Sequence, residues 1–317
     1  MRRHTVILSP VQIQAFHEHG FLALEAVSTS EEIALLRMVL DRLLMTRAGF
    51  NEGAQFDLLR GDEGATENNL LQIMNPVNYA PELRDTLFRA NALAIAQQLL
   101  GEQATPFFEH AIFKPAGRGA ATPWHQDEAY RPEPDYVYRE LSIWMPLQDV
   151  SVENGCMQFV PGTNRGDVLI HRSANNDPNT HALECCGNFD RTKAVACPLR
   201  SGGCTVHAGR TLHYAGPNRT DIPRWAYIVA FDLPPKRRAG TRQFGWNDEK
   251  HSADMARRRV WLVRGGLFVH AWRMLRNGVL NNPSRMKYLM RRAWQTLVKS
   301  RVARAAQSDI AGQDQGA

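Results

Sequence analysis

Two residues near the middle of the chain have the types and the spacing of metal ligands. His125 and Asp127 are separated by one residue and follow a Gly- and Pro-rich turn, PAGRGAATPW. In a β-strand, residues i and i+2 point to the same face, so this imidazole and this carboxylate can reach one ion. With a second histidine they would make a facial set of two nitrogens and one carboxylate, which binds Fe(II) and leaves positions open for oxygen chemistry.

Two downstream histidines, His207 and His213, compete for the third position in the segment GGCTVHAGRTLHYAGPNRTDIPRWAYIVAF. Arg224 favours His213. Iron chemistry of this type uses 2-oxoglutarate as reductant, and the buried distal carboxylate of that molecule needs a cationic, bidentate partner such as arginine. If His213 ends one strand and residues 214–223 form a turn, Arg224 starts the antiparallel return strand beside the metal. His207 stays the rival ligand, and its other role would be that of a strand histidine satisfied by hydrogen bonds.

The elements that must position these residues are mainly strands. From about residue 105 the sequence consists of short runs rich in β-branched and aromatic residues, broken by Gly, Pro and Asn clusters. The clearest runs are TPFFEHAIFKP, YRELSIWMPL, MQFVPG, AVACPL, CTVHAG and RWAYIVAF. Because no helical pattern intervenes until about residue 250, a double-sheet jelly roll is favoured over an α/β fold. Residues 166–192 are predicted to form a long loop that acts as a lid or binding segment.

Helices are predicted on both sides of this strand region. A capping box at residues 9–12 opens a short helix that Gly20 closes. A second capping box, at residues 28–31, opens a helix with leucines on one face. Residues 82–100 are predicted to be helical and to end at Gly101. The first third of the chain is therefore expected to be mostly helical.

The C-terminal part differs from the rest in charge. Residues 251–317 hold thirteen Arg or Lys and three Asp, a formal charge of +10, which leaves −4 of the total +6 for the other residues. This tail is interpreted either as a solvated helix face or as a surface for an acidic partner, anionic lipid or an anionic substrate. No nucleic-acid-binding signature accompanies it, so we expect no nucleic-acid partner.

These patterns divide the chain into one domain and additions. The predicted parts are a domain at 1–245 with a helical part at 9–100 and a jelly-roll core at about 105–235, a basic helical extension at 246–305 that Pro283 divides, and a disordered tail at 306–317.

Composition limits the class of protein. The chain has 317 residues with 44% hydrophobic content, which is enough for a full core. No apolar run reaches the roughly 18 residues of a membrane span, and the N-terminus has no export signal. The five cysteines include no CxxC pair, which indicates neither a disulfide framework nor a zinc ribbon. We therefore expect a cytoplasmic protein without a transmembrane segment. The sequence does not specify an oligomeric state.

Three blocks of the sequence, WHQDEAY, IWMPLQDVSVENGCMQFVPGTNRG and LHYAGPN…PRWA, resemble the phytanoyl-CoA dioxygenase family. The resemblance covers about residues 9–235. It implies a double-stranded β-helix, or cupin-like jelly roll, with helices before and after it. It also implies Fe(II) as cofactor and 2-oxoglutarate and O2 as cosubstrates. Family members often carry serine two residues after the distal histidine, where this chain has Ala215.

The same resemblance assigns roles to individual residues. His125, Asp127 and His213 would hold the iron, and Arg224, eleven residues after His213, would hold 2-oxoglutarate. Further candidates for holding the cosubstrate are His110, Lys114 and Trp144. Because the related halogenases replace the iron carboxylate by Ala or Gly, the presence of Asp127 favours oxygenation.

The expected activity is hydroxylation of an unactivated C–H bond in a small organic molecule, with release of succinate and CO2. The substrate would be a secondary metabolite, an amino-acid derivative or an acyl-CoA. Desaturation, epoxidation and cyclisation use the same iron centre and stay open as products. Two other classes also stay open, a catalytically silent binding protein on this fold and a zinc hydrolase with the same ligands. Oxygen dependence and succinate formation distinguish the three.

Overall fold

The computed structural model describes residues 2–60, 69–131, 133, 135–242 and 244–276. By its internal contacts the chain divides into two units, residues 1–270 and residues 271–317. The fold described below is that of the first unit. Pro283 and the tail from residue 306, for which we predicted a helix break and disorder, lie outside the described residues.

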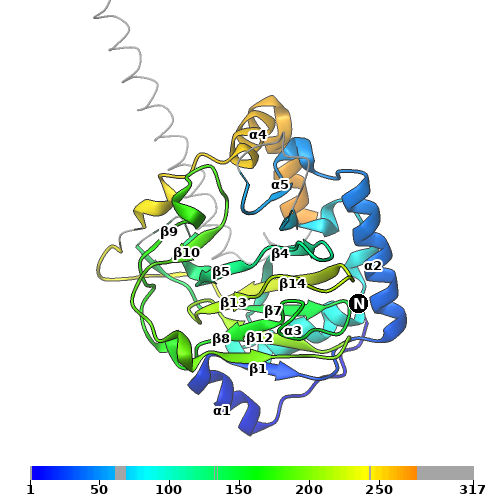
Figure 1. The fold of residues 1–317 in the computed structure, drawn as a ribbon, viewed down its shortest axis with the longest axis vertical. Helices are drawn as coiled ribbons and strands as arrows, with labels where there is room; N and C mark the ends of the chain where they lie inside the picture. Colours follow the sequence, from blue (N-terminus) through cyan, green and yellow to red (C-terminus); the bar gives the residue numbers. More distant parts are fainter. Residues whose placement is uncertain (1, 61–68, 132, 134, 243, 277–317) are drawn as a thin grey trace, which may run out of the picture. The chain divides into compact units, whose positions relative to one another are not determined.

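The first unit is built on a large antiparallel sheet of seven strands in the order β1-β12-β7-β14-β4-β3-β2 (Figure 1). Its strands are β1 (Phe21–Leu24), β2 (Gln55–Asp57), β3 (Leu71–Met74), β4 (Thr105–Lys114), β7 (Glu140–Pro146), β12 (Cys204–Ala208) and β14 (Arg224–Asp232). The first third of the chain was expected to be mostly helical, yet β1, β2 and β3 all come from it. These three strands have three or four residues each, and pairing with strands distant in sequence stabilises them.

A small sheet of four strands, in the order β11-β8-β13-β5, faces the inner side of the large sheet. Its strands are β5 (Thr122–His125), β8 (Met157–Phe159), β11 (Val195–Cys197) and β13 (His213–Ala215). The two sheets enclose an apolar core, which confirms the predicted double-sheet jelly roll.

Two further ladders have two strands each. They pair β9 (His171–Ser173) with β10 (Leu183–Cys185), and β6 (Tyr136–Val137) with β15 (Lys236–Arg237). The prediction of a long loop at 166–192 was therefore wrong in part, because β9 and β10 lie within that segment. Strands β9 and β10 have three residues each and contain no β-branched residue and no Phe, Tyr or Trp, which are the usual signal of a strand.

Five α-helices are present among the described residues. They are α1 (Pro10–His19), α2 (Ser30–Met45), α3 (Leu87–Leu100), α4 (Ala253–Trp261) and α5 (Leu267–Arg276). The predicted capping box of α1 is confirmed, because Ser9 accepts from the backbone N–H of Gln12 and the Gln12 side chain accepts from Ser9 N. Gly20 ends this helix with φ +85°.

Two helix starts differ from the predictions. The N-cap of α2 is Thr29, one residue later than expected, and its hydroxyl accepts from Glu32 N. Helix α3 begins at Leu87 rather than at residue 82, because Thr86 caps it and a separate 3-10 turn occupies residues 81–84. In both places a threonine hydroxyl satisfies an N–H that has no partner within the helix.

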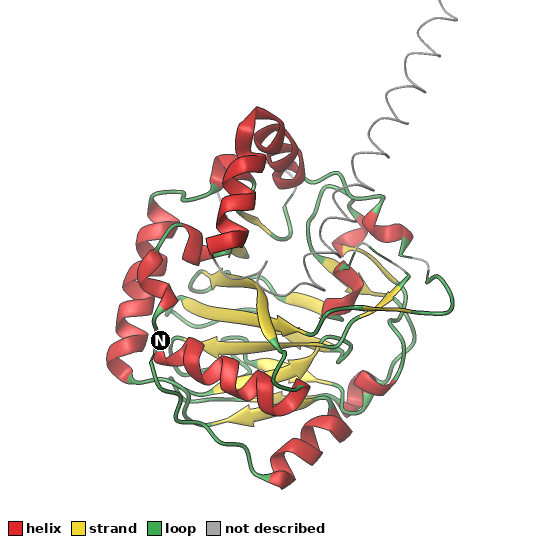
Figure 2. Cartoon of the chain, turned by 180° about the vertical axis from the view of Figure 1, so that it is seen from behind, coloured by secondary structure: helices red, strands yellow, loops and turns green. Residues whose placement is uncertain are grey.

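Helices cover one face of the large sheet. Helix α3 contacts β4, β7 and β14, and Figure 2, seen from behind, shows a helix lying across the strands. Along each strand alternate residues pack outward against the helices, for example Tyr227 and Val229 on β14, while Ala226 and Ile228 point into the space between the sheets. One face of the large sheet is therefore packed against helices, and its other face can line a site.

The segment after residue 245 returns to helix, as predicted. Residues 246–270 group with the first unit, and Arg257 donates from Nε to the carbonyl of Phe50 at 3.0 Å. Within the described residues, no helix has the length and apolar character needed to cross a membrane.

Candidate metal centre

His125 and His213 face each other across two strands of the small sheet. They end β5 and begin β13, are direct partners in the ladder, and have ring centroids 4.1 Å apart. The Nδ1 atoms of the two rings lie 2.7 Å from Pro123 O and 2.8 Å from Thr211 O. Because a carbonyl only accepts, each Nδ1 carries the proton, and each Nε2 keeps a lone pair that can bind a metal.

Asp127 lies between the two sheets. One oxygen of its carboxylate faces the small sheet, and the other faces the large sheet. Its Oδ1 is 3.6 Å from His125 Nε2 and 3.4 Å from His213 Nε2. Its Oδ2 accepts a hydrogen bond from Ser142 Oγ at 2.7 Å and lies 3.2 Å from His207 Nε2. His207 and Ser142 are themselves direct partners on β12 and β7. The large sheet therefore holds Oδ2 and leaves Oδ1 directed at the two histidines.

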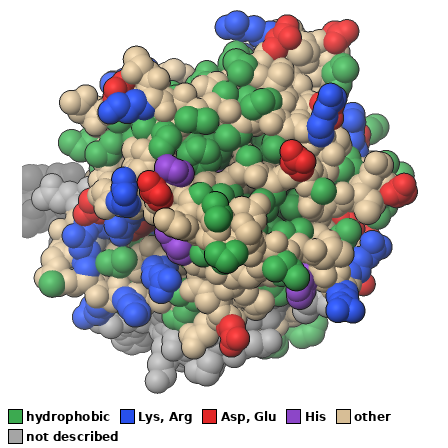
Figure 3. Space-filling view, turned by 90° about the horizontal axis from the view of Figure 1, so that it is seen from below, with side chains coloured by type: hydrophobic (Ala, Val, Ile, Leu, Met, Phe, Trp, Pro, Cys, Tyr) green, Lys and Arg blue, Asp and Glu red, His purple; other side chains and the backbone are tan. Residues whose placement is uncertain are grey.

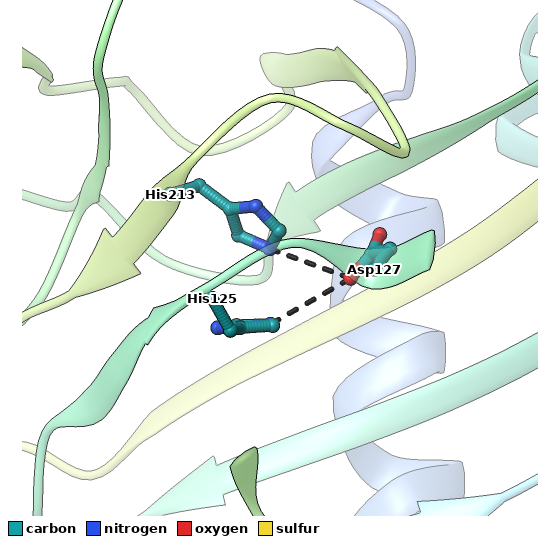
Figure 4. A group of neighbouring side chains, drawn as sticks. All are labelled: His125, Asp127 and His213. Carbon is teal, nitrogen blue, oxygen red and sulfur yellow. Dashed lines mark ion pairs between the residues drawn. The ribbon is translucent and has the colours of Figure 1, made fainter. Parts of the chain in front are cut away.

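The side chains of His125, Asp127 and His213 converge on one point (Figure 4). One ligand atom from each lies within 4.8 Å of the others. Two imidazole nitrogens and one carboxylate oxygen match the facial ligand set of non-haem iron(II) oxygenases.

The backbone around Asp127 is a turn rather than a strand. We expected residues 125 and 127 to share one strand face, but β5 ends at His125 and a 3-10 turn, η4 (Asp127–Tyr130), begins with the carboxylate residue. The buried carboxylate of Glu128 anchors this turn through ion pairs with Arg210 and Arg242 at 2.6 Å each. The turn directs the carboxylate back toward the histidines.

Burial and charge give these groups the protonation states that a metal requires. Burial lowers the pKa of His125, and the neighbouring His213 lowers it further, so the imidazole is neutral at pH 7. Burial by itself raises the pKa of Asp127, but the surrounding histidines, His213 first, outweigh it and hold that pKa well below 3.8. A neutral imidazole beside an ionised carboxylate is the donor chemistry that divalent iron takes.

Arg224 begins β14, and its guanidinium is enclosed between the sheets. The side chain is almost fully buried, yet Nε and Nη1 have no hydrogen-bond partner within the described part of the chain. Burial lowers the pKa of Arg224 to about 9, so it is still cationic at pH 7. Its Cζ lies 5.5 Å from the centroid of the Trp144 ring. A buried guanidinium with open donors fits a carboxylate ligand, because an unpartnered buried cation is costly.

The predicted hairpin from His213 to Arg224 was wrong. His213 belongs to β13 in the small sheet, whereas Arg224 belongs to β14 in the large sheet. The intervening segment crosses from one sheet to the other, so the histidine and the arginine lie on opposite walls. The expected inward direction of Arg224 agrees with Ala226 and Ile228, which follow it on alternate positions and pack between the sheets.

The three secondary candidates also lie on the inner face of the large sheet. His110 Nδ1 lies 3.0 Å from Gln72 Oε1, and burial lowers the pKa of His110 to about 4. Lys114 is fully buried, and its Nζ donates to the carbonyls of residues 215 and 216 at 2.9 and 2.5 Å. Trp144 packs in the core between the sheets. Lys114 is thus engaged with the backbone after the distal histidine, while Trp144 lies beside the open guanidinium.

Two more buried polar atoms on this face have no partner among the described residues. They are Thr205 Oγ1 and His207 Nδ1, both on β12. Thr205 is the direct neighbour of Trp144 in the ladder. Together with the Arg224 guanidinium, these groups make the inner wall rich in unsatisfied donors and acceptors, which a bound organic acid would satisfy.

Sequence reasoning missed Ser142, and it treated His207 only as a rival ligand or an ordinary strand histidine. A signal for Ser142 was present, because it precedes Trp144 by two residues on one strand and must share its face. Its partner in the ladder depends on strand order, which sequence does not specify.

Residues 166–192 reach the centre through Tyr130. The hydroxyl of Tyr130 accepts from Leu183 N on β10 at 2.8 Å. Its ring meets His125 edge to face, with centroids 5.8 Å apart. This segment is therefore connected to His125 through Tyr130.

Known proteins of similar sequence are dioxygenases. The family model of phytanoyl-CoA dioxygenase matches residues 16–226. A probable alpha-ketoglutarate-dependent hypophosphite dioxygenase from Stutzerimonas stutzeri is 28% identical over 227 residues, which is 69% of this chain and 77% of that protein. Phytanoyl-CoA dioxygenase domain-containing protein 1 from Bos taurus is 27% identical over 259 residues, with 69% and 88% covered.

Solved structures agree with this similarity. The crystal structure of EvdO2 from Micromonospora carbonacea var. aurantiaca superimposes with a TM-score of 0.66 at 37% identity, over 77% of this chain and 99% of that chain. A second crystal structure of EvdO2 contains 2-oxoglutarate. With the family model covering most of the jelly roll and the histidine-carboxylate centre in place, the chain belongs to the phytanoyl-CoA dioxygenase family of non-haem iron, 2-oxoglutarate-dependent dioxygenases.

Proposed function

We propose that this enzyme hydroxylates an unactivated C–H bond of a small organic molecule, with His125, Asp127 and His213 as its iron ligands and Arg224 as its 2-oxoglutarate anchor. The substrate classes we favour are a secondary metabolite, an amino-acid derivative or an acyl-CoA. Iron with 2-oxoglutarate supplies the two electrons that activation of O2 requires. Release of succinate and CO2 would accompany each turnover.

The observation that carries the proposal is that Nε and Nη1 of the buried Arg224 have no hydrogen-bond partner among the described residues. A zinc hydrolase with the same three ligands has no use for a buried arginine whose Nε and Nη1 lack partners. A distal carboxylate would accept two parallel hydrogen bonds from it in a site with low solvent access. The binding of 2-oxoglutarate by EvdO2, at 37% identity, supports the same assignment.

Other residues of the chain would prepare the centre. Ser142 and His207 hold Asp127 Oδ2, so the carboxylate is oriented before metal binds. Apolar side chains between the sheets exclude water from the space beside Arg224, which strengthens its attraction for an anion. His110 and Trp144 are further candidates to contact the cosubstrate. Lys114 would act indirectly, by holding the backbone after His213.

We also propose that the enzyme works in the reducing cytoplasm. Its five cysteines are all free thiols in the structure, although Cys185 and Cys186 are adjacent in sequence. A protein exported to an oxidising compartment more often pairs its cysteines.

The decisive test is anaerobic addition of Fe(II) and then 2-oxoglutarate to the metal-free protein. The chelate of the keto acid on iron has a weak visible charge-transfer band, which we expect for wild type. His213→Ala should lose the band because it loses an iron ligand, and Arg224→Ala should need much more 2-oxoglutarate to develop it. His17→Ala, on exposed α1, is the matched control and should behave as wild type.

Each alternative has its own signature in this experiment. A folded wild type that binds iron and shows no band at any 2-oxoglutarate concentration would contradict the proposal. Hydrolysis of a substrate under anaerobic conditions with zinc would favour a hydrolase. A normal band without succinate formation from any substrate tried would favour a binding protein.

A further inference from the structure

Residues 260–276 form a helical segment whose apolar side chains are turned to solvent. Among the most exposed large hydrophobic residues of the described chain, Val263 is 86% exposed, Phe268 81%, and Leu267 and Trp272 60% each. On α5, Phe268, Trp272 and Leu275 follow the i, i+4, i+7 spacing of one helix face, and Leu267 lies beside them. Soluble domains normally bury such a face, so the exposed one marks an interaction surface.

The charged side chains of residues 260–276 are all basic. Arg273 lies on the side of α5 away from Phe268, and Arg276 follows Trp272 by one turn on the same side. Arg264 precedes both in the π-helical turn Leu262–Gly266. The sequence contains no Asp or Glu from residue 255 to residue 308, against thirteen Arg or Lys. Residues 1–250 carry a formal charge of −4, and Figure 3 shows acidic and basic side chains together on one face. The cationic character therefore belongs to this segment.

Exposed apolar side chains together with arginines favour one kind of partner. A nucleic acid would neutralise the arginines but would leave Val263 and Leu267 exposed to water. A bilayer with anionic headgroups offers both phosphates for the guanidinium groups and an acyl layer for the apolar side chains. The segment would lie in the plane of the interface, because α5 carries its apolar side chains along one side and arginines beside them.

We propose that residues 260–276 dock this enzyme on the surface of an anionic lipid bilayer. Val263, Leu267, Phe268 and Trp272 enter the boundary between headgroups and acyl chains, and the arginines pair with anionic headgroups. None of these residues belongs to the metal centre, so docking and catalysis are separable. The inference does not depend on the proposed substrate.

The test uses the full-length protein and sedimentation with vesicles. Wild type is expected to partition at least about tenfold more strongly to vesicles of phosphatidylcholine with phosphatidylglycerol than to phosphatidylcholine alone. Added salt should weaken the binding, because it screens the arginines. Phe268→Glu should reduce partitioning at least about tenfold, since it removes a ring that would be buried in the bilayer and adds a charge that the anionic headgroups repel.

Ile7→Glu is the matched control. Ile7 is 82% exposed, like Phe268, but lies in the N-terminal segment, so this variant should bind vesicles as wild type does. Both variants should melt at the wild-type temperature, because both positions are on the surface. The charge-transfer band with Fe(II) and 2-oxoglutarate should also be unchanged in both.

Three results would overturn the docking proposal. The first is wild-type binding that is no stronger to anionic than to neutral vesicles. The second is an equal loss in Phe268→Glu and Ile7→Glu. The third is a dimer in analytical ultracentrifugation that Phe268→Glu dissociates, in a protein that does not bind vesicles, because a second copy would then be the occupant of this face.

Discussion

At the scale of single residues, the centre combines two cross-strand pairs, one from each sheet. His125 and His213 are partners in the small sheet, and Ser142 and His207 are partners in the large sheet. Asp127 joins the two pairs through its two oxygens. Strand pairing places such side chains within a few ångströms of each other without any requirement on sequence distance.

Without a bound carboxylate, the buried guanidinium of Arg224 lowers the stability of the folded protein, so replacing it should change the melting temperature. Arg224→Met should raise the melting temperature of the protein without cosubstrate, because an open buried guanidinium is replaced by an apolar side chain of similar length. The same variant should bind 2-oxoglutarate on the order of 100-fold more weakly, since a charge-assisted pair is lost. Thermal melts and calorimetric titrations with 2-oxoglutarate and Mn(II) check both parts. A variant that melts lower than wild type would show that the guanidinium has partners in solution.

Substitutions of His207 test whether this residue orients Asp127 or binds the metal itself. His207→Ala leaves Asp127 Oδ2 with Ser142 alone, so metal affinity should fall roughly 10- to 100-fold. His207→Gln should recover part of it, because the amide N–H can donate to the carboxylate. Mn(II) binding followed by electron paramagnetic resonance measures the affinity directly. If His207→Ala abolishes binding as completely as His213→Ala, and Gln does not rescue it, His207 is a ligand.

At the scale of elements, the position of the proposed ligand His213 depends on how the N-terminal helix meets the loop before β13. Gly20 ends α1, and its carbonyl accepts a hydrogen bond from Thr211 Oγ1 at 2.7 Å. Thr211 in turn fixes the ring of His213 through its carbonyl. Two hydrogen bonds through Thr211 therefore connect the end of the first helix to the proposed metal ligand His213.

Gly20→Ala should destabilise the fold for two reasons. Its φ of +85° disfavours a side chain, and a Cβ would lie 2.5 Å from Thr211 Oγ1. Gly117→Ala is the control, because Gly117 has φ +69° but open space around it. We expect Gly20→Ala to lose at least about 1 kcal/mol more unfolding free energy than Gly117→Ala, as overpacking of a close contact does. Urea denaturation measures both, and equal losses would mean that the contact with Thr211 adjusts without cost.

At the scale of the whole molecule, stability should depend on pH through Lys250. Lys250 is buried, its Nζ lies 4.5 Å from the centroid of the Tyr130 ring, and burial lowers its pKa to about 8. Between about pH 8 and the unfolded pKa of roughly 10.4, the unfolded chain holds more protons than the folded one. The contribution of this lysine to stability therefore rises with pH across that window and is most unfavourable below it.

Lys250→Met removes this contribution. The variant should be more stable than wild type at pH 7, on the order of 1 to 3 kcal/mol, and the difference should shrink as the pH approaches 10. Denaturant unfolding of both proteins at several pH values provides the comparison, because the other titrating groups cancel in the difference. A difference that does not change with pH would contradict the assigned pKa.

The sequence by itself determined the chemistry and much of the local structure. Histidine and carboxylate at positions 125 and 127, with a histidine at 213 and an arginine at 224, indicated the reaction class, and the blocks around them indicated the family. The capping box of α1, the end of this helix at Gly20 and the six clearest strand signals were also readable, because capping and side-chain alternation act over a few residues.

Tertiary structure alone decided how these parts meet. Sequence placed His213 and Arg224 on one hairpin, whereas the fold places them on opposite sheets. It gave no sign that β2, β3, β9 and β10 would form, or that Ser142 and His207 would become partners beside Asp127. Strands of three or four residues have little stability alone, and they exist because a paired strand satisfies their backbone hydrogen bonds.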